Sequence, residues 1–249
     1  MRFVASLDVW TVVVSGYATD TPIWERHPAG DELLHVLDGG LDVTTLTAAG
    51  PVHASVPTGS LFVCRKGLWH WARPRGHTAV LSLTPGEGTG HLQVDPRRAS
   101  GVSLDFPADT PAGAGSAADV WDLPAALAAL TPVEITEDTT EAEANGAMRE
   151  LGWLHDRLVG VMRFAGETPW ERHPDGDELL HVLDGEVDLT VLTDTGPRHV
   201  SIAAGSVFVC PRGLWHRQRP KTAATILFAT PTATSEASWA DDPRVERSQ

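Results

Sequence analysis

A sixteen-residue stretch occurs twice in this chain, with a single substitution between the copies. The first copy, WERHPAGDELLHVLDG, spans residues 24–39, and the second, WERHPDGDELLHVLDG, spans residues 170–185. A further shared stretch follows each copy and ends at His70 and at His216. Equivalent residues of both stretches are 146 positions apart, so no insertion separates them in either half. The repeat indicates two copies of one structural unit, and chemistry available to one half is available to the other.

The 249 residues suffice for two modest domains, each with its own hydrophobic core. C-terminal to each copy, apolar and polar residues alternate with a period of two, and turns rich in Gly, Pro and Asp separate these runs. The predicted fold is therefore all-β, with domains at residues 1–95 and 148–233. Residues 96–147 are expected to form a mostly irregular linker with a short helix after Asp122, and residues 234–249 a loosely held tail.

Composition excludes some classes of partner. The formal charge of −14, with no cluster of Lys and Arg, argues against nucleic acid, and no apolar run is long enough to cross a membrane. The two cysteines, Cys64 and Cys210, are repeat equivalents, which favours buried apolar positions over a disulfide and indicates a reducing compartment. The N-terminus lacks the pattern of a cleaved leader, so a cytoplasmic protein is expected.

Each half can bring two histidines and a glutamate together. On an extended strand Glu25 and His27 share a face, and the turn at Pro28 and Gly30 returns the chain with Glu32. His70 enters a later strand from a loop. Two imidazoles and one carboxylate with open positions suit Fe(II), and Mn, Zn or Ni can also use such a set.

These spacings resemble the two motifs of the cupin superfamily. In the first motif a histidine is followed by three or four residues, a glutamate, six residues and a glycine, which matches His27 to Gly39. The second, G-x5-P-x-G-x2-H, matches Gly205 to His216, while the first half has Arg65 at the proline position. The resemblance covers both halves and implies a bicupin, with two tandem double-stranded β-helix (jelly-roll) barrels. It also implies association through sheet edges, so a homodimer is expected.

The resemblance further implies a divalent metal ion in each half, and the matching ligands are His27, Glu32, His70, His173, Glu178 and His216. One position departs from the family pattern, because Glu25 and Glu171 replace the first histidine of the motif. If they ligate, the set of two histidines and two carboxylates favours Fe(II) or Mn(II), with Zn or Ni as alternatives. If they do not, each is a candidate catalytic base. A polar pocket without a tightly bound metal is the third interpretation.

Two further patterns have alternative explanations. The spacing Glu32-x-x-His35 is typical of helical di-iron proteins, but the His-Pro and Gly-Asp turns and the alternating strands leave no room for long helices. On a strand His35 faces away from Glu32 and is expected to pack. Arg217, which replaces Trp71 of the first half, could bind a substrate carboxylate or form an ordinary salt bridge.

The expected function is that of a metal-dependent enzyme acting on a small organic molecule. Oxygenase (dioxygenase-like) chemistry is the first expectation, and metal-dependent isomerase or cyclase chemistry the second. The alternative from another class is a non-catalytic binding or sensor bicupin. One active and one silent half is a further alternative, in which Pro211 favours the C-terminal half as the better-kept motif. No nucleophile elbow, phosphate-cradling loop or dinucleotide motif supports other chemistries.

Overall fold

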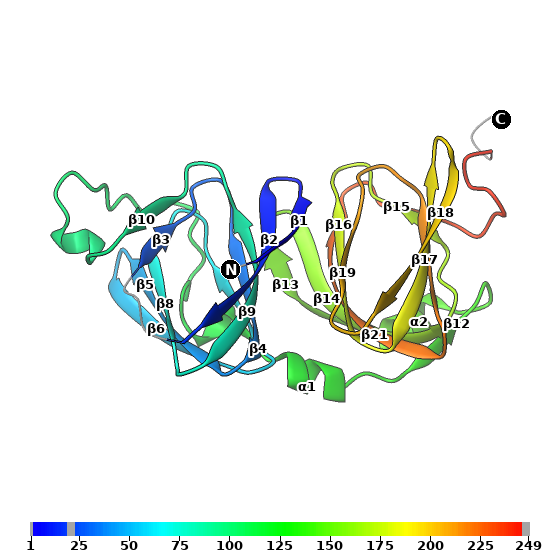
Figure 1. Ribbon diagram of the computed structural model, residues 1–249, viewed down its shortest axis with the longest axis horizontal. Coiled ribbons are helices and arrows are strands. Elements are labelled where there is room, and N and C mark those ends of the chain that lie inside the picture. Colours follow the sequence, from blue (N-terminus) through cyan, green and yellow to red (C-terminus); the bar gives the residue numbers. More distant parts are fainter. Residues whose placement is uncertain (1, 19–22, 246–249) are drawn as a thin grey trace. The chain divides into compact units, whose positions relative to one another are not determined.

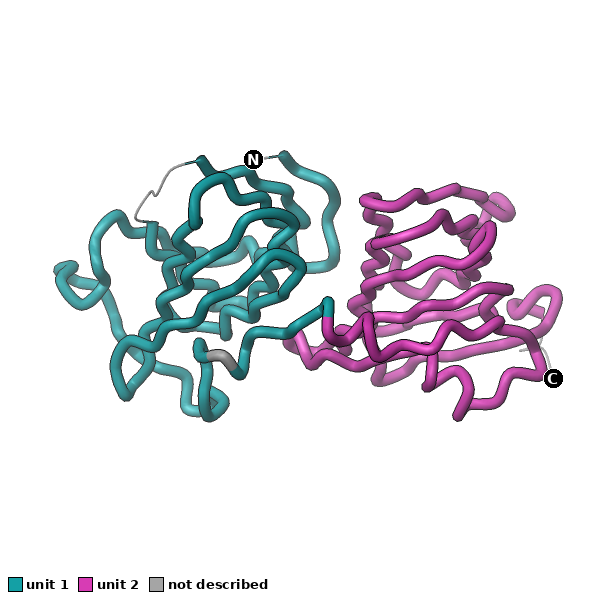
Figure 2. The backbone as a smooth tube through the Cα atoms, turned by 90° about the horizontal axis from the view of Figure 1, so that it is seen from below, with its two compact units in different colours: residues 1–124 teal, residues 125–249 magenta. Residues whose placement is uncertain are grey.

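The computed structural model describes residues 2–18 and 23–245, and the chain divides into two compact units, Met1–Pro124 and Ala125–Gln249 (Figure 2). Each unit is built mainly from antiparallel strands (Figure 1), as the alternating sequence predicts. Within the described ranges, no helix combines the length and the apolarity needed to cross a membrane.

The described part of the N-terminal unit contains two sheets. Their strands are β1 (Arg2–Leu7), β2 (Trp10–Tyr17), β3 (Trp24–Arg26), β4 (Glu32–Asp38), β5 (Gly40–Thr47), β6 (Gly50–Pro57), β7 (Leu61–Cys64), β8 (His70–Pro74), β9 (Thr78–Pro85), β10 (Gly90–Leu92) and β11 (Val120–Trp121). One sheet has the order β1-β2-β9-β4-β7-β11 and the other β10-β3-β8-β5-β6. Apart from the hairpins β1–β2 and β5–β6, consecutive strands lie in different sheets in the jelly-roll manner, which gives a two-sheet sandwich instead of one closed barrel.

The described part of the C-terminal unit repeats this arrangement. Its elements are β12 (Val133–Ile135), α2 (Glu141–Gly146), β13 (Met148–Leu154), β14 (Arg157–Gly166), β15 (Trp170–Arg172), β16 (Glu178–Asp184), β17 (Glu186–Thr193), β18 (Gly196–Ala203), β19 (Val207–Cys210), β20 (His216–Pro220), β21 (Ala223–Pro231) and β22 (Glu236–Ser238). One sheet has the order β12-β14-β21-β16-β19, with β13 also paired to β14, and the other β18-β17-β20-β15-β22.

The segment between residues 96 and 147 combines loops with short elements. It contains two 3-10 turns, Pro96–Arg98 and Ala117–Asp119, together with α1 (Leu123–Ala128), α2, β11 and β12. The helix predicted after Asp122 is α1. Thr140 caps α2 by a capping box with Glu143, which explains why this acidic stretch becomes helical.

The core of each unit lies between its two sheets. In the N-terminal unit Leu34 and Val36 of β4 meet Leu41 and Val43 of β5 in one buried cluster. A continuous apolar run predicts a fully buried strand at both β7 and β19. All four residues of β7 are buried, but in β19 only Cys210 is, so the prediction is wrong for the second copy. Both cysteines are buried and free, in agreement with the expectation from their number and spacing.

Both sixteen-residue stretches end in glycine for a steric reason. Gly39 and Gly185 have φ values of +80° and +84°, a conformation that side chains rarely adopt. A Cβ atom would lie 2.3 Å from the carbonyl oxygen of His77 at the first position, and 2.4 Å from that of Ala223 at the second. The turn out of β4 or β16 therefore requires glycine.

His181, the repeat equivalent of His35, gives the C-terminal unit a pH-dependent stability. It is buried on the face of β16 opposite Glu178, and burial lowers the pKa of His181 to about 4. Below about pH 6.5 the unfolded chain binds a proton that the folded unit does not bind until about pH 4. His181 should therefore contribute a fall of about 3 kcal/mol in the free energy of unfolding as the pH drops through this window.

Urea denaturation between pH 7 and pH 4 measures this effect. His181→Asn should flatten the dependence, whereas replacing the exposed His199 should leave it unchanged. An unaltered pH dependence in the His181 variant would contradict the assignment.

Candidate metal centres

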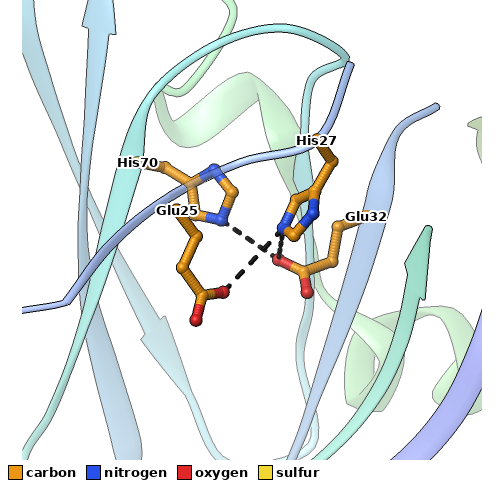
Figure 3. A group of neighbouring side chains, drawn as sticks. All are labelled: Glu25, His27, Glu32 and His70. Carbon is orange, nitrogen blue, oxygen red and sulfur yellow. Dashed lines mark hydrogen bonds and ion pairs between the residues drawn. The ribbon is translucent and has the colours of Figure 1, made fainter. Parts of the chain in front are cut away.

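Four residues singled out from the sequence converge inside the N-terminal unit (Figure 3). Glu25 lies on β3, His27 directly follows this strand, Glu32 begins β4 and His70 begins β8. Each residue offers one ligand atom, and these atoms lie within 4.8 Å of one another. The turn between β3 and β4 carries the chain from one sheet to the other, which lets donors from both sheets meet.

Glu32 lies at the centre of this group. Its Oε2 atom is 3.4 Å from Nε2 of His27 and 3.1 Å from Nε2 of His70. Oε2 of Glu25 is 3.8 Å from Nε2 of His27. The side chains of His27, Glu32 and His70 are buried, whereas that of Glu25 is 34% exposed. The group thus has three enclosed donors and one carboxylate that solvent reaches.

Backbone hydrogen bonds hold the two histidine-bearing segments together. The amide of Gly67 donates to the carbonyl oxygen of His27 over 3.0 Å, and the amide of Lys66 donates to Oδ1 of Asp31 over 2.7 Å. Both bonds recur at the equivalent positions of the C-terminal unit. They tie the loop before the second histidine to the turn after the first, which explains the fixed spacing of the two stretches.

Hydrogen bonds at Nδ1 determine which nitrogen of each imidazole faces the group. The Thr89 hydroxyl donates to the carbonyl oxygen of Pro85, so it accepts from Nδ1–H of His27 over 3.0 Å. Nδ1 of His70 donates to the carbonyl oxygen of Leu68 over 3.3 Å. A neutral ring with its proton on Nδ1 presents the lone pair of Nε2 to the centre, as a metal ligand must.

A threonine orients the central glutamate in each unit. The hydroxyl of Thr84 donates to Oε1 of Glu32, and that of Thr230 donates to Oε1 of Glu178. This leaves Oε2 of Glu32 facing both imidazoles, whereas Oε2 of Glu178 faces His216 and Oε1 of Glu178 is the atom nearer to His173. Neighbouring groups of this kind fix the direction of a ligand and its basicity.

Removing these threonine hydroxyls should weaken metal binding without removing a ligand. Thr84→Val and Thr230→Val are each expected to lower the affinity of the adjacent centre by about 10- to 100-fold. Competition with a fluorescent chelator measures the affinity. Thr44→Val is the matched control, because the Thr44 hydroxyl is bonded to the exposed His53. Equal affinities in all three variants would contradict a role for the hydroxyls.

The charges of the N-terminal group are strongly coupled. Burial opposes ionisation of Glu32, but the imidazoles of His27 and His70 outweigh it and hold the pKa of Glu32 well below its usual range. Burial likewise opposes charge on His70, yet the Glu32 carboxylate raises the pKa of His70 above its ordinary value. The carboxylate is therefore ionised and attracts positive charge, either protons on the imidazoles or a cation between them.

The equivalent residues of the C-terminal unit also converge, but their ligand atoms form two overlapping sets of three instead of one set of four. Nε2 of His216 is 2.9 Å, and Nε2 of His173 3.6 Å, from the Glu178 carboxylate. Ligand atoms of Glu171, His173 and His216 lie within 4.8 Å of one another. Ser235 takes the place of Thr89 and receives the Nδ1 hydrogen bond of His173 over 2.8 Å. Burial and the charge of Glu178 raise the pKa of Glu171.

Orphaned buried atoms show that these residues fit a metal ion. Nε2 of His27, His173 and His216, and Oε2 of Glu178, are buried without a well-formed hydrogen bond. Such groups cost free energy unless something satisfies them, and a cation between the two imidazoles and the central carboxylate would do so. This donor set is typical of Fe(II) or Mn(II).

A thiol also borders the second group. Ligand atoms of Cys210, Glu178 and His216 lie within 4.8 Å of one another. Burial raises the pKa of Cys210 to about 11 and that of Cys64 well above its ordinary value. Both thiols are therefore protonated at neutral pH in the metal-free protein.

A cavity of about 460 Å³ opens beside the N-terminal group. Glu25, Glu32 and His70 line it together with residues of β2, β8 and β9. His91 on β10 also lines the cavity, with Nε2 3.6 Å from Oε1 of Glu25 and a side chain that is 59% exposed. A small molecule in this cavity would contact Glu25 directly.

Sequence reasoning missed the hydroxyl residues and His91. Thr84 and Thr230 are 146 residues apart, as are Thr89 and Ser235. The recurrence of a hydroxyl residue at the 146-residue offset of the repeat could have identified these four residues from the sequence. His91 has no such signal, because alanine occupies the equivalent position, 237.

Two arginines at positions where a half departs from its partner or from the motif, Arg217 and Arg65, both form ion pairs. Arg217 forms an ion pair with Glu167 at 3.2 Å and stacks on the Trp170 ring at 4.5 Å, which is the ordinary structural role weighed for it. Arg65, at the proline position of the motif, forms ion pairs with Asp31 and Asp119. The departure from the motif is thus accommodated by local charges.

Comparison with known proteins gives consistent matches. The model of the "Cupin domain" family matches residues 160–229. The uncharacterized protein YdbB of Bacillus subtilis is 34% identical over 86 residues, which cover 34% of this chain and 70% of that protein. An acireductone dioxygenase of Rhodopseudomonas palustris is 32% identical over 113 residues, which cover 42% of this chain and 68% of the dioxygenase.

Similarity to solved structures extends over both units. A deletion mutant of Bacillus subtilis oxalate decarboxylase matches with a TM-score of 0.60 at 12% identity, covering 92% of this chain and 70% of the decarboxylase. Another structure of that enzyme, from work on its Mn(II) centres, matches with a TM-score of 0.59. At this identity the likeness shows a shared two-unit fold.

Proposed function

We propose that this chain, which belongs to the cupin superfamily, is a metal-dependent enzyme that acts on a small organic molecule by dioxygenase-like chemistry. The observation that carries the proposal is the N-terminal group of Glu25, His27, Glu32 and His70, which opens on a cavity of about 460 Å³. A set of donors alone is compatible with a structural ion. A set of donors beside a cavity supports catalysis, because a second molecule can reach it.

In this proposal His27, Glu32 and His70 hold a divalent metal ion, and Glu25 lies beside it. A bound ion would supply Lewis acidity and, if it is Fe(II) or Mn(II), reactivity toward dioxygen. The name of the acireductone dioxygenase relative supports chemistry with dioxygen, and the Mn(II) centres named for the decarboxylase support Mn(II). Two free buried thiols support a cytoplasmic setting.

The chain's own residues prepare the site for proton transfer. Thr84 and Thr89 orient Glu32 and His27 through one hydrogen bond each. The Glu25 carboxylate reaches both the centre and the cavity, and it can take a proton from a substrate carbon or hydroxyl. His91 beside Glu25 can pass that proton to solvent.

Redox-neutral chemistry, such as isomerisation or cyclisation, is the second candidate. The partly exposed carboxylate of Glu25 favours it, because proton transfer by a base beside a Lewis acid needs no oxidant. Dioxygen consumption separates the two candidates. A non-catalytic sensor would bind ligand and leave it unchanged.

Metal analysis followed by a substrate screen tests the proposal. Purified protein should contain up to two ions per chain, and His27→Ala and His173→Ala should each remove one of them. Dioxygen uptake and absorbance are then followed across small aromatic and 1,3-dicarbonyl compounds. Sub-stoichiometric metal that is unchanged in both variants would overturn the metal-dependent function. Stoichiometric metal without turnover of any compound would favour the sensor.

A further inference from the structure

The two units differ in what fills the space between their sheets next to the metal donors. In the N-terminal unit hydroxyl side chains line the cavity beside Glu32 and His70. They are contributed by Thr11, Ser15 and Tyr17 of β2 and by Ser82 and Thr84 of β9. Partial burial and the nearby carboxylates of Glu25 and Glu32 raise the pKa of Tyr17, so its phenol is protonated and can donate a hydrogen bond.

A phenylalanine occupies the matching place in the C-terminal unit. Strand pairing sets Ser82 opposite Val13, and in the second unit it sets Phe228 opposite Gly160. A Cβ atom on Gly160 would lie 2.4 Å from Cζ of Phe228, so the ring lies directly over this glycine. Phe228 is 8% exposed and belongs to the buried core cluster. The glycine therefore makes room for a ring that fills the interior.

Neighbouring positions change in the same direction. By strand register, Leu158 replaces Thr11 and Met162 replaces Ser15. Both apolar side chains pack against the core cluster that contains Phe228. Hydroxyls facing a cavity in one unit thus become packed apolar groups in the other, while the metal donors stay the same.

The charge of the N-terminal cavity limits what it can bind. The described residues that line it include neither lysine nor arginine, but they include the carboxylates of Glu25 and Glu32. A ligand with two negative charges would meet no guanidinium or ammonium group in this partly buried space. Hydroxyl groups both donate and accept, so the wall matches hydroxyl and carbonyl groups of an uncharged molecule.

We propose that the N-terminal cavity binds an uncharged, hydroxyl-bearing small molecule, and that the C-terminal centre holds its metal ion closed to such ligands. The inference rests on the proposed function and names its substrate class and its working half. Both units thus have the metal donors, but a ligand can reach only the donors of the N-terminal unit.

Two single-centre variants test the asymmetry without altering the cavity. In Mn(II)-loaded protein, His173→Ala keeps only the N-terminal centre and His27→Ala only the C-terminal one. Catechol and 3-hydroxy-2-butanone serve as uncharged probes, and oxalate as the dianion. The probes should change the Mn(II) electron paramagnetic resonance spectrum in His173→Ala and leave it unchanged in His27→Ala. Oxalate should bind the N-terminal centre at least about tenfold more weakly than catechol.

Exchanging the facing pairs Val13–Ser82 and Gly160–Phe228 between the units tests whether these residues cause the difference in ligand binding. Val13→Gly with Ser82→Phe should lower catechol affinity at least about tenfold while Mn(II) is retained. Gly160→Val with Phe228→Ser should let catechol perturb the C-terminal centre. Equal responses of both centres, or oxalate binding as tight as that of catechol, would overturn the inference.

A further measurement distinguishes failure of this inference from failure of the proposed metal-dependent function. If the wild-type protein binds no metal, calorimetric titration of catechol into the metal-free protein still decides the question. Binding that the Val13→Gly and Ser82→Phe pair abolishes would support the cavity assignment, and no binding would refute it.

Discussion

Glutamine in place of Glu32 is expected to remove the metal ion from the N-terminal unit and leave that of the C-terminal unit in place. The central carboxylate has its Oε2 within 3.4 Å of both imidazoles, and His27 and His70 stabilise its charge. Glutamine has nearly the same shape but no charge, so it weakens the attraction for a divalent cation with little change in packing. The affinity should fall by more than about 100-fold, because loss of a ligand exceeds the effect of a ligand's neighbours.

Elemental analysis after dialysis measures the metal content, which should be one ion per chain in Glu32→Gln instead of two. Glu178→Gln should remove the other ion, and the double variant should bind none. Replacement of the exposed Glu87 by glutamine is the matched control, because it removes the same charge from the surface. Circular dichroism checks that each variant is folded. Full metal content in Glu32→Gln would show that Glu32 is not a ligand.

The spacing of the two stretches predicted the fold and the converging donors for identifiable reasons. A strand that carries Glu25 and leads into His27, a turn at Pro28 and Gly30, and Glu32 at the start of the next strand leave few arrangements for the chain. The equivalence of His70 and His216 then placed the second imidazole. Short edge strands such as β10 and β22 could not be predicted, because three residues show no period and their pairing depends on β3 and β15.

The difference between the halves could not be inferred from the stretches themselves. Pro211 made the C-terminal motif the better match, but Arg65 is accommodated in the first half by ion pairs with Asp31 and Asp119. The residues that decide access, Ser82 and Phe228, lie outside both stretches. Strand register pairs Phe228 with Gly160, and the ring lies over this glycine at the position equivalent to Ser82. The cavity therefore supports the N-terminal half as the working one.

Replacing Glu25 by glutamine should lower turnover by about 100- to 10,000-fold at unchanged metal content, because it removes the proposed base and keeps its shape. Oε2 of Glu25 lies 3.8 Å from His27, and the carboxylate lines the cavity, so it can contact both the centre and a substrate. Turnover is measured with the compound found in the substrate screen. KM should change much less than kcat, since the amide still fills the space.

Glu171→Gln is the matched control, because Glu171 holds the equivalent position in the unit where Phe228 fills the interior. Turnover should be unchanged in this variant if only the N-terminal cavity admits substrate. Loss of metal together with turnover in Glu25→Gln would instead place Glu25 among the ligands. Equal losses of turnover in both variants would contradict the division of roles, since two equivalent carboxylates would then do equivalent work despite unequal access.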